Sequence, residues 1–66
     1  MYLTTAELSK ELGLKSVTLD AWRQRGEGPP YVRLGRAVRY LRADVDAWVL
    51  ARRVGPLAGE EQLKNR

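Results

Sequence analysis

The sequence predicts a mainly α-helical fold with one small β-hairpin. Two short amphipathic segments, separated by about three residues that include a glycine, are typical of a helix-turn-helix. An alternating segment with a glycine near its middle follows, which is typical of a β-hairpin, and a third amphipathic segment comes after it. The chain has 66 residues, of which 44% are hydrophobic, so these elements are expected to form one small domain around a single core.

The first helix is expected over residues 5–12. Thr4 and Glu7 have the spacing of a capping box, in which each side chain accepts a hydrogen bond from the backbone N–H of the other. Leu8 and Leu12 are four residues apart, so both face the core. A glycine directly after this segment is a typical helix stop.

The second helix is expected over residues 16–25 and is stopped by Gly26. Leu19 and Trp22, three residues apart, form its apolar stripe. The connection between the two helices is residues 13–15. So short a turn indicates a helix-turn-helix, although any antiparallel helix pair in a small bundle has a similar pattern.

Residues 26–30 form a connector, because two glycines and two prolines exclude a helix or a central strand. A β-hairpin is expected over residues 31–40. A two-residue loop would pair Arg33 with Val38 and mix charged and apolar groups on each face. A three-residue loop pairs Arg33 with Arg39 instead and is the register we expect, since it gathers apolar side chains on one face: Val32, Leu34, Val38 and Tyr40.

The third helix is expected over residues 43–53, with Val45, Trp48 and Val49 facing inward. Both tryptophans of the chain lie on apolar helix stripes. We therefore expect them in the core rather than as platforms on which bases of single-stranded nucleic acid stack.

The chain contains no cysteine and no histidine. This composition excludes thiolate nucleophiles, disulfides, histidine bases and Cys/His zinc sites. The remaining carboxylates fit helix capping and solubility, since a domain of this size has little room for an acid–base cleft. We therefore expect no enzyme activity, no catalytic residue, no metal and no cofactor. No apolar run is long enough for a membrane span, so no membrane partner is expected.

Positive charge is concentrated in one segment of the chain. Residues 23–42 contain six arginines and a single acidic residue, Glu27, a net charge of +5, whereas the whole chain carries +4. Arginine suits bidentate contacts with phosphate or guanine. The segment therefore indicates nucleic-acid binding, with a solvated basic surface as the alternative.

Several short motifs follow one another along the chain: Leu3-Thr4-Thr5-Ala6-Glu7-Leu8, Leu12-Gly13-Leu14, Thr18, Trp22-Arg23-x-x-Gly26, Gly28-Pro29-Pro30, Leu34-Gly35-Arg36, Val38-Arg39-Tyr40 and Asp44-Val45-x-x-Trp48. With these motifs, about residues 3–53 resemble the excisionase and MerR-like winged helix-turn-helix family. The resemblance implies a winged helix-turn-helix DNA-binding domain over residues 1–53. Residues 54–66 are then a C-terminal tail, either a short helix or flexible.

The resemblance also implies where DNA is bound. The second helix is the recognition helix and the hairpin is the wing. The expected contacts from the helix are Lys15, Ser16, Val17, Thr18, Asp20, Ala21, Arg23, Gln24 and Arg25, and those from the wing are Arg33, Arg36 and Arg39.

This sequence departs from the family pattern at the recognition helix. Lys15 stands where the family usually has a serine or aspartate cap, and Asp20 and Ala21 stand where arginine or tyrosine is frequent. With 100° per residue, the face opposite the apolar stripe carries Val17, Asp20, Ala21 and Gln24. Because this face is poorly basic, we expect the helix to read sequence and the wing to bind phosphate or the minor groove.

Small members of this family are phage or plasmid excisionases, also called recombination directionality factors, or small transcriptional regulators, and the first of these is the function we expect. The resemblance thus implies a cytoplasmic, nucleoid-associated protein of a bacterial host. It binds and bends double-stranded DNA near a phage or plasmid attachment site and directs an integrase towards excision. Copies of the chain, each expected to be monomeric when free, are expected to bind tandem sites cooperatively. A MerR-like transcriptional regulator, a protein-interaction adaptor and an RNA-binding module are the alternatives.

Overall fold

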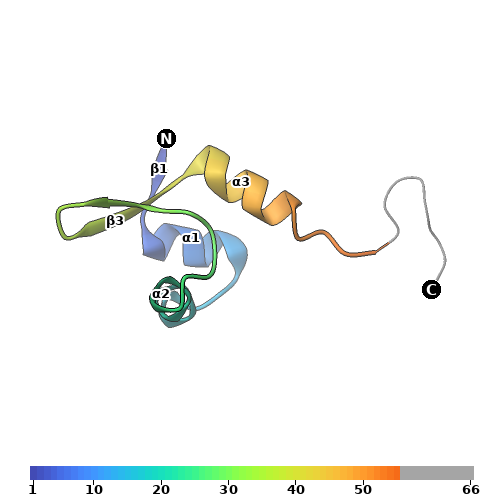
Figure 1. Cartoon of the computed structure of the whole chain (residues 1–66), viewed down its shortest axis with the longest axis horizontal. Coiled ribbons are helices and arrows are strands. Elements are labelled where there is room, and N and C mark those ends of the chain that lie inside the picture. Colours follow the sequence, from blue (N-terminus) through green and yellow to red (C-terminus); the bar gives the residue numbers. More distant parts are fainter. Residues whose placement is uncertain (56–66) are drawn as a thin grey trace.

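A computed structural model describes residues 1–55 and has a mainly α-helical fold with a small antiparallel sheet, as expected (Figure 1). Within this range no helix is long and apolar enough to cross a membrane. Most of the expected tail, residues 56–66, lies outside the described range. In chain order the elements are β1 (Tyr2–Leu3), α1 (Thr5–Leu12), α2 (Ser16–Gln24), β2 (Val32–Leu34), β3 (Ala37–Leu41) and α3 (Arg42–Leu50).

Helix α1 has the bounds and the cap that the sequence predicts. The backbone N–H of Thr4 donates to Glu7 Oε1 at 2.8 Å, and that of Glu7 donates to Thr4 Oγ1 at 3.0 Å. Helix α2 begins after Lys15, whose side chain makes no capping hydrogen bond, and it ends one residue earlier than expected. The helix-turn-helix prediction is confirmed.

The sheet has the order β1-β3-β2, and both pairs of strands are antiparallel. Strand β1 is absent from the sequence-based expectation. It has two residues, which is too few to give an alternating pattern. Its pairing of Leu3 with Tyr40 places the N-terminus of the chain beside β3.

The expected hairpin register is wrong. Strands β2 and β3 pair Leu34 with Ala37 and Arg33 with Val38, which leaves a two-residue loop. Gly35, the first loop residue, has a φ of +64°, whereas no non-glycine residue of the described chain has a positive φ. This pattern fits a type II′ turn, in which only the first of the two loop residues has a positive φ. The preference of the glycine for this turn therefore has more influence on the hairpin register than the separation of apolar and charged side chains onto opposite faces. Leu34, expected inside, is 56% exposed.

The core consists of five buried side chains contributed by β1, α1, α2, β3 and α3. Leu12, Trp22 and Val38 pack against it. Helix α3 contributes one of the five, whereas Val49, also expected inside, is exposed; Figure 1 shows the end of α3 running away from the sheet. The five core residues are Leu3, Leu8, Leu19, Tyr40 and Val45.

The two tryptophans are only partly buried and lie beside the core. Their ring centroids are 5.6 Å apart, and Trp22 packs against the core cluster whereas Trp48 packs on Trp22. The guanidinium of Arg52 lies over the ring of Trp48, 4.1 Å from its centroid. The rings thus join α2 to α3, which agrees with a packing role.

Gly28 lies tightly against Trp22 and has a φ of +86°. A Cβ atom there would approach Trp22 Cε3 to 2.9 Å. We expect Gly28→Ala to lower the free energy of unfolding by about 2–4 kcal/mol, because overpacking adds to backbone strain. Gly26→Ala is the matched control, since Gly26 has a φ of +72° but nothing within 4 Å. It should cost about 1–2 kcal/mol. Equal losses for both variants in urea unfolding would contradict the close contact.

Arg42 joins α1 to α3 by donating hydrogen bonds to both carboxylate oxygens of Glu11 and to Asp46 Oδ1, the last at 3.2 Å. The hydrogen bond from Arg42 lowers the pKa of Glu11 below its ordinary value. The pair therefore stabilises the fold above the ordinary carboxyl pKa, and this contribution is lost as pH falls through the lowered value.

We accordingly expect Glu11→Gln to melt below the parent at pH 7, and the difference to vanish in strong acid. Melting temperatures of both proteins between pH 7 and pH 2 measure it. A difference that stays constant over this range would show that the pair does not act through its charge.

Candidate nucleic-acid interface

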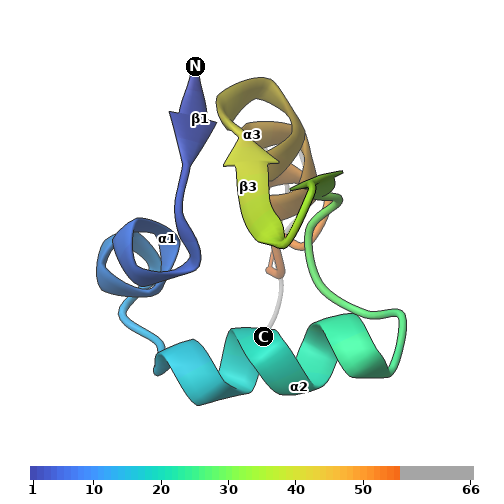
Figure 2. The same cartoon turned by 90° about the vertical axis from the view of Figure 1, so that its left-hand side faces the viewer.

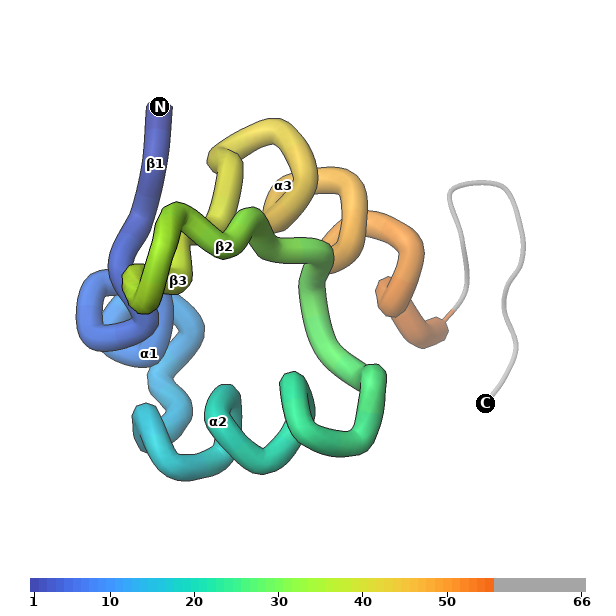
Figure 3. Tube along the Cα trace, turned by 60° about the vertical axis from the view of Figure 1, so that its left-hand side comes forward, coloured from blue at the N-terminus to red at the C-terminus, as the bar shows by residue number. Residues whose placement is uncertain are grey.

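Helix α2 and the hairpin face each other across an open groove. In Figure 2 helix α2 lies across from the hairpin, and the connector joins their ends at one side; Figure 3 shows the same arrangement along the backbone. The groove has a volume of about 430 Å³. Its lining comes from α2, from the residue just before β2, and from both hairpin strands and their loop: Asp20, Arg23, Gln24, Tyr31, Arg33, Arg36 and Val38.

The face of α2 that the helical wheel assigned to DNA is partly accessible. Val17 is 66% exposed, and Gln24 is also exposed, whereas Asp20 and Ala21 are half-buried. Of the other expected helix contacts, Thr18 is half-buried, and the rest outside the groove are exposed: Lys15, Ser16 and Arg25.

Arg33 and Arg39 lie on opposite faces of the hairpin because of the two-residue loop. Arg33 is on the groove side, with its guanidinium 5.9 Å from the ring centroid of Tyr31. Arg36 is at the hairpin turn and also lines the groove. Arg39 is half-buried, and its Nη1 donates to the backbone carbonyl of Val38 at 2.8 Å. Arg33 and Arg36 therefore line the same groove, whereas Arg39 lies on the other face of the hairpin.

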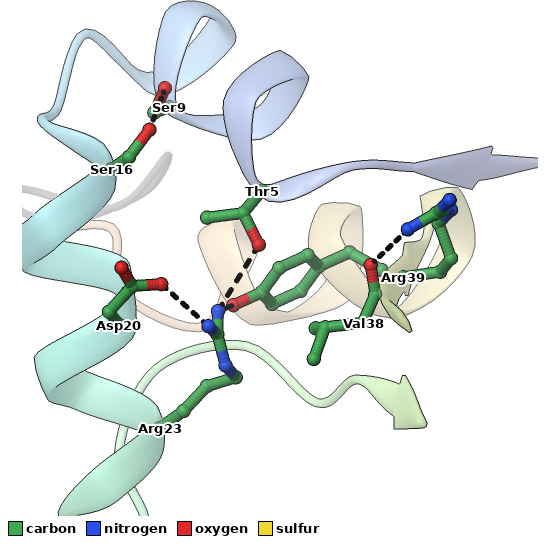
Figure 4. Close-up of polar contacts among 8 residues, drawn as sticks. Thr5, Ser9, Ser16, Asp20, Arg23, Val38 and Arg39 are labelled. Carbon is green, nitrogen blue, oxygen red and sulfur yellow. Dashed lines mark hydrogen bonds and ion pairs between the residues drawn. The ribbon is translucent and has the colours of Figure 1, made fainter. Parts of the chain in front are cut away.

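Arg23 points into the fold rather than outward. Its Nη1 donates to Tyr40 Oη at 2.8 Å and to Thr5 Oγ1 at 3.3 Å, and its Nη2 donates to Asp20 Oδ1 at 2.6 Å. Figure 4 shows Asp20 and Arg23 side by side on α2, with Thr5 reaching Arg23 from α1. The guanidinium therefore joins α2 to α1 and β3.

Burial alone would lower the pKa of the Arg23 guanidinium, but its hydrogen bonds to Tyr40 and Asp20 outweigh burial and raise the pKa above its ordinary value. The group is thus fixed as a cation. Its side chain is 17% exposed, and the residue lines the groove. The sequence pattern did not indicate the hydrogen bonds to Thr5 and Tyr40, because periodicity contains no information on such long-range partners.

Ion pairs divide the six arginines of residues 23–42 into two groups. Three have carboxylate partners: Arg23 with Asp20, Arg25 with Glu27 at 3.2 Å, and Arg42 with Glu11 and Asp46. On α3, Asp46 pairs with Arg42 and not with Arg39 of the hairpin. The other three of these six have no carboxylate partner among the described residues, and they are the arginines of the hairpin: Arg33, Arg36 and Arg39.

Tyr31 belongs to the groove although sequence reasoning gave it no site role. Its ring centroid lies 6.1 Å from that of Tyr40, and the guanidinium groups of Arg23 and Arg33 lie 5.8 and 5.9 Å from it. An aromatic residue directly after two prolines and before the arginine-rich hairpin is the signal that could have indicated it.

A protein-family model described as a helix-turn-helix domain matches residues 2–53. The match covers β1 to α3 and therefore includes every residue of the groove. This family includes excisionase-like DNA-binding proteins and is typically non-enzymatic. No curated protein matches the chain.

Proposed function

Because this chain belongs to the helix-turn-helix domain family, we propose that it binds double-stranded DNA with α2 in the major groove and the β2–β3 hairpin against the backbone or minor groove. One observation carries the proposal. The three arginines of the hairpin have no carboxylate partner within the described chain, and two of them line the groove that faces α2. Unpaired positive charge next to an exposed helix face is complementary to the phosphates that flank a major groove.

The two elements have different tasks in this proposal. On α2, Val17 and Ala21 offer apolar contacts to thymine methyl groups and Gln24 can pair with adenine. The hairpin supplies the phosphate contacts, which position the protein without reading sequence. The proposed helix contacts are Lys15, Ser16, Val17, Thr18, Asp20, Ala21, Arg23, Gln24 and Arg25, and the proposed hairpin contacts are Arg33, Arg36 and Arg39. Arg23 is in addition joined to α1 and β3 by its hydrogen bonds to Thr5 and Tyr40.

The biological role we propose is that of an excisionase acting on the nucleoid of a bacterial host. A single domain of this size covers a short DNA site, so useful affinity requires several copies on tandem sites. Copies bound side by side also bend the DNA, which helps an integrase run recombination towards excision. The resemblance of residues 3–53 to excisionases supports this role.

Footprinting on DNA that flanks the gene tests the proposal. Tandem protected sites near an attachment site, a bend in a circular-permutation assay, and excision that requires both this protein and a neighbouring integrase would support the excisionase role. A single protected promoter site with changed transcription would instead identify a regulator. Absence of binding to any duplex DNA at micromolar protein would contradict DNA recognition altogether.

A further inference from the structure

The groove between α2 and the hairpin contains one carboxylate among the described residues that line it, that of Asp20. An acidic side chain is unexpected on a surface that binds a polyanion, because it repels phosphate. Asp20 lies four residues before Gln24 on α2, so the two side chains are neighbours on the proposed recognition face.

Asp20 is held in place by Arg23. Its Oδ1 accepts a hydrogen bond from Arg23 Nη2 at 2.6 Å (Figure 4), and Arg23 is itself tied to Thr5 and Tyr40. Because the guanidinium is anchored by α1 and β3, the carboxylate loses little additional conformational freedom when it meets a ligand. Arg23 thus orients Asp20 in advance.

The carboxylate also remains accessible. The side chain of Asp20 is 50% exposed, and its second oxygen, Oδ2, makes no hydrogen bond within residues 1–55. This oxygen is an acceptor only. Where a bound ligand displaces water from this oxygen, the ligand must supply a donor. In the major groove the donors on base edges are the N4 amino group of cytosine and the N6 amino group of adenine.

Cytosine fits this oxygen better than adenine. Adenine presents its N7 acceptor beside the N6 amino group, so a carboxylate placed there meets an electron-rich atom, whereas the major-groove edge of cytosine presents the N4 donor without an acceptor of its own. We propose that Asp20 is a specificity-determining residue that accepts a hydrogen bond from N4 of a cytosine, and that Arg23 is the positioning residue that orients it. This inference rests on the proposed DNA binding.

The experiment is selection of binding sites from a randomised duplex library, with the full chain and its Asp20→Asn variant. The amide keeps an oxygen for Arg23 but loses the charge. The parent should select cytosine at one fixed position, and Asp20→Asn should reduce that preference by about 5- to 100-fold while the other positions keep theirs. Asp20→Ser is the second variant and should have the same effect if Asp20→Asn does not fold.

Glu27→Gln is the matched control. It also removes one carboxylate that pairs with an arginine of the same segment, but Glu27 does not line the groove. Its site preference should equal that of the parent. Arg23→Lys should weaken the cytosine preference alone, since lysine lacks the fork that joins Asp20 to Tyr40.

Unchanged preference at every position in Asp20→Asn, or a uniform rise in affinity for all sequences, would overturn the role of Asp20 and leave DNA binding intact. A parent protein that selects no duplex at all would instead refute the proposed function. A melting temperature measured for each variant shows whether it is folded under the selection conditions.

Discussion

Replacing Leu19 with alanine should lower the free energy of unfolding by about 3–5 kcal/mol. The side chain is fully buried, at 0% exposure, and packs in the cluster that joins α2 to α1 and β3. Deleting three carbon atoms there leaves a cavity as well as removing apolar contacts. Because a domain of this size is stabilised by only about 3–10 kcal/mol in total, much of the variant should be unfolded at 25 °C.

Urea unfolding followed by circular dichroism measures this loss. Val17→Ala is the matched control, since Val17 lies on the same helix but is 66% exposed. It should change stability by less than about 0.5 kcal/mol. A Leu19→Ala variant that unfolds at the same urea concentration as Val17→Ala would show that α2 is not anchored through this residue.

The double variant Arg33→Ala/Arg36→Ala should bind DNA about 100-fold more weakly than the parent. Each arginine has no carboxylate partner within residues 1–55, and a hydrogen bond to a charged group is worth about 1.5 kcal/mol, which is close to tenfold in affinity. The loss should be equal on target and random DNA, because phosphate contacts carry no sequence information. The slope of log K against log salt should flatten by about two units.

Fluorescence anisotropy over a range of salt concentrations, on both DNAs, provides these quantities. Arg53→Ala is the control, since it removes one exposed positive charge beyond the end of α3 and outside the groove. Gln24→Ala provides the contrast, because it should cost about 1–3 kcal/mol on the target and little on random DNA. A double variant with the salt slope of the parent would show that the hairpin does not contact phosphate.

Local signals were sufficient for the helices of the helix-turn-helix. The capping box at Thr4 and Glu7 determines where α1 begins, and the bounds of that helix agree with the prediction. The end of α2 differs by one residue. These features depend on hydrogen bonds between residues three or four positions apart, so the local sequence is sufficient to predict them.

The sequence also determined that the positive charge is concentrated in residues 23–42, but not which arginines of this segment have no carboxylate partner. Half of the arginines in residues 23–42 have carboxylate partners, one of them on another helix, since Arg42 binds Glu11 of α1. The sequence pattern also did not indicate the hydrogen bonds of Arg23 to Thr5 and Tyr40, since they join residues 17 or more positions apart.

The hairpin register and strand β1 were decided by the tertiary structure. Sorting side chains by face favoured pairing Arg33 with Arg39, but a two-residue loop whose first residue, Gly35, has a positive φ places Arg33 opposite Val38. Strand β1 has only two residues, too few for an alternating pattern, and it forms by pairing with the edge of β3 that β2 does not occupy. By themselves, residue types determine local hydrogen bonds and apolar stripes, whereas pairing between distant segments depends on which backbone edges the folded chain brings together.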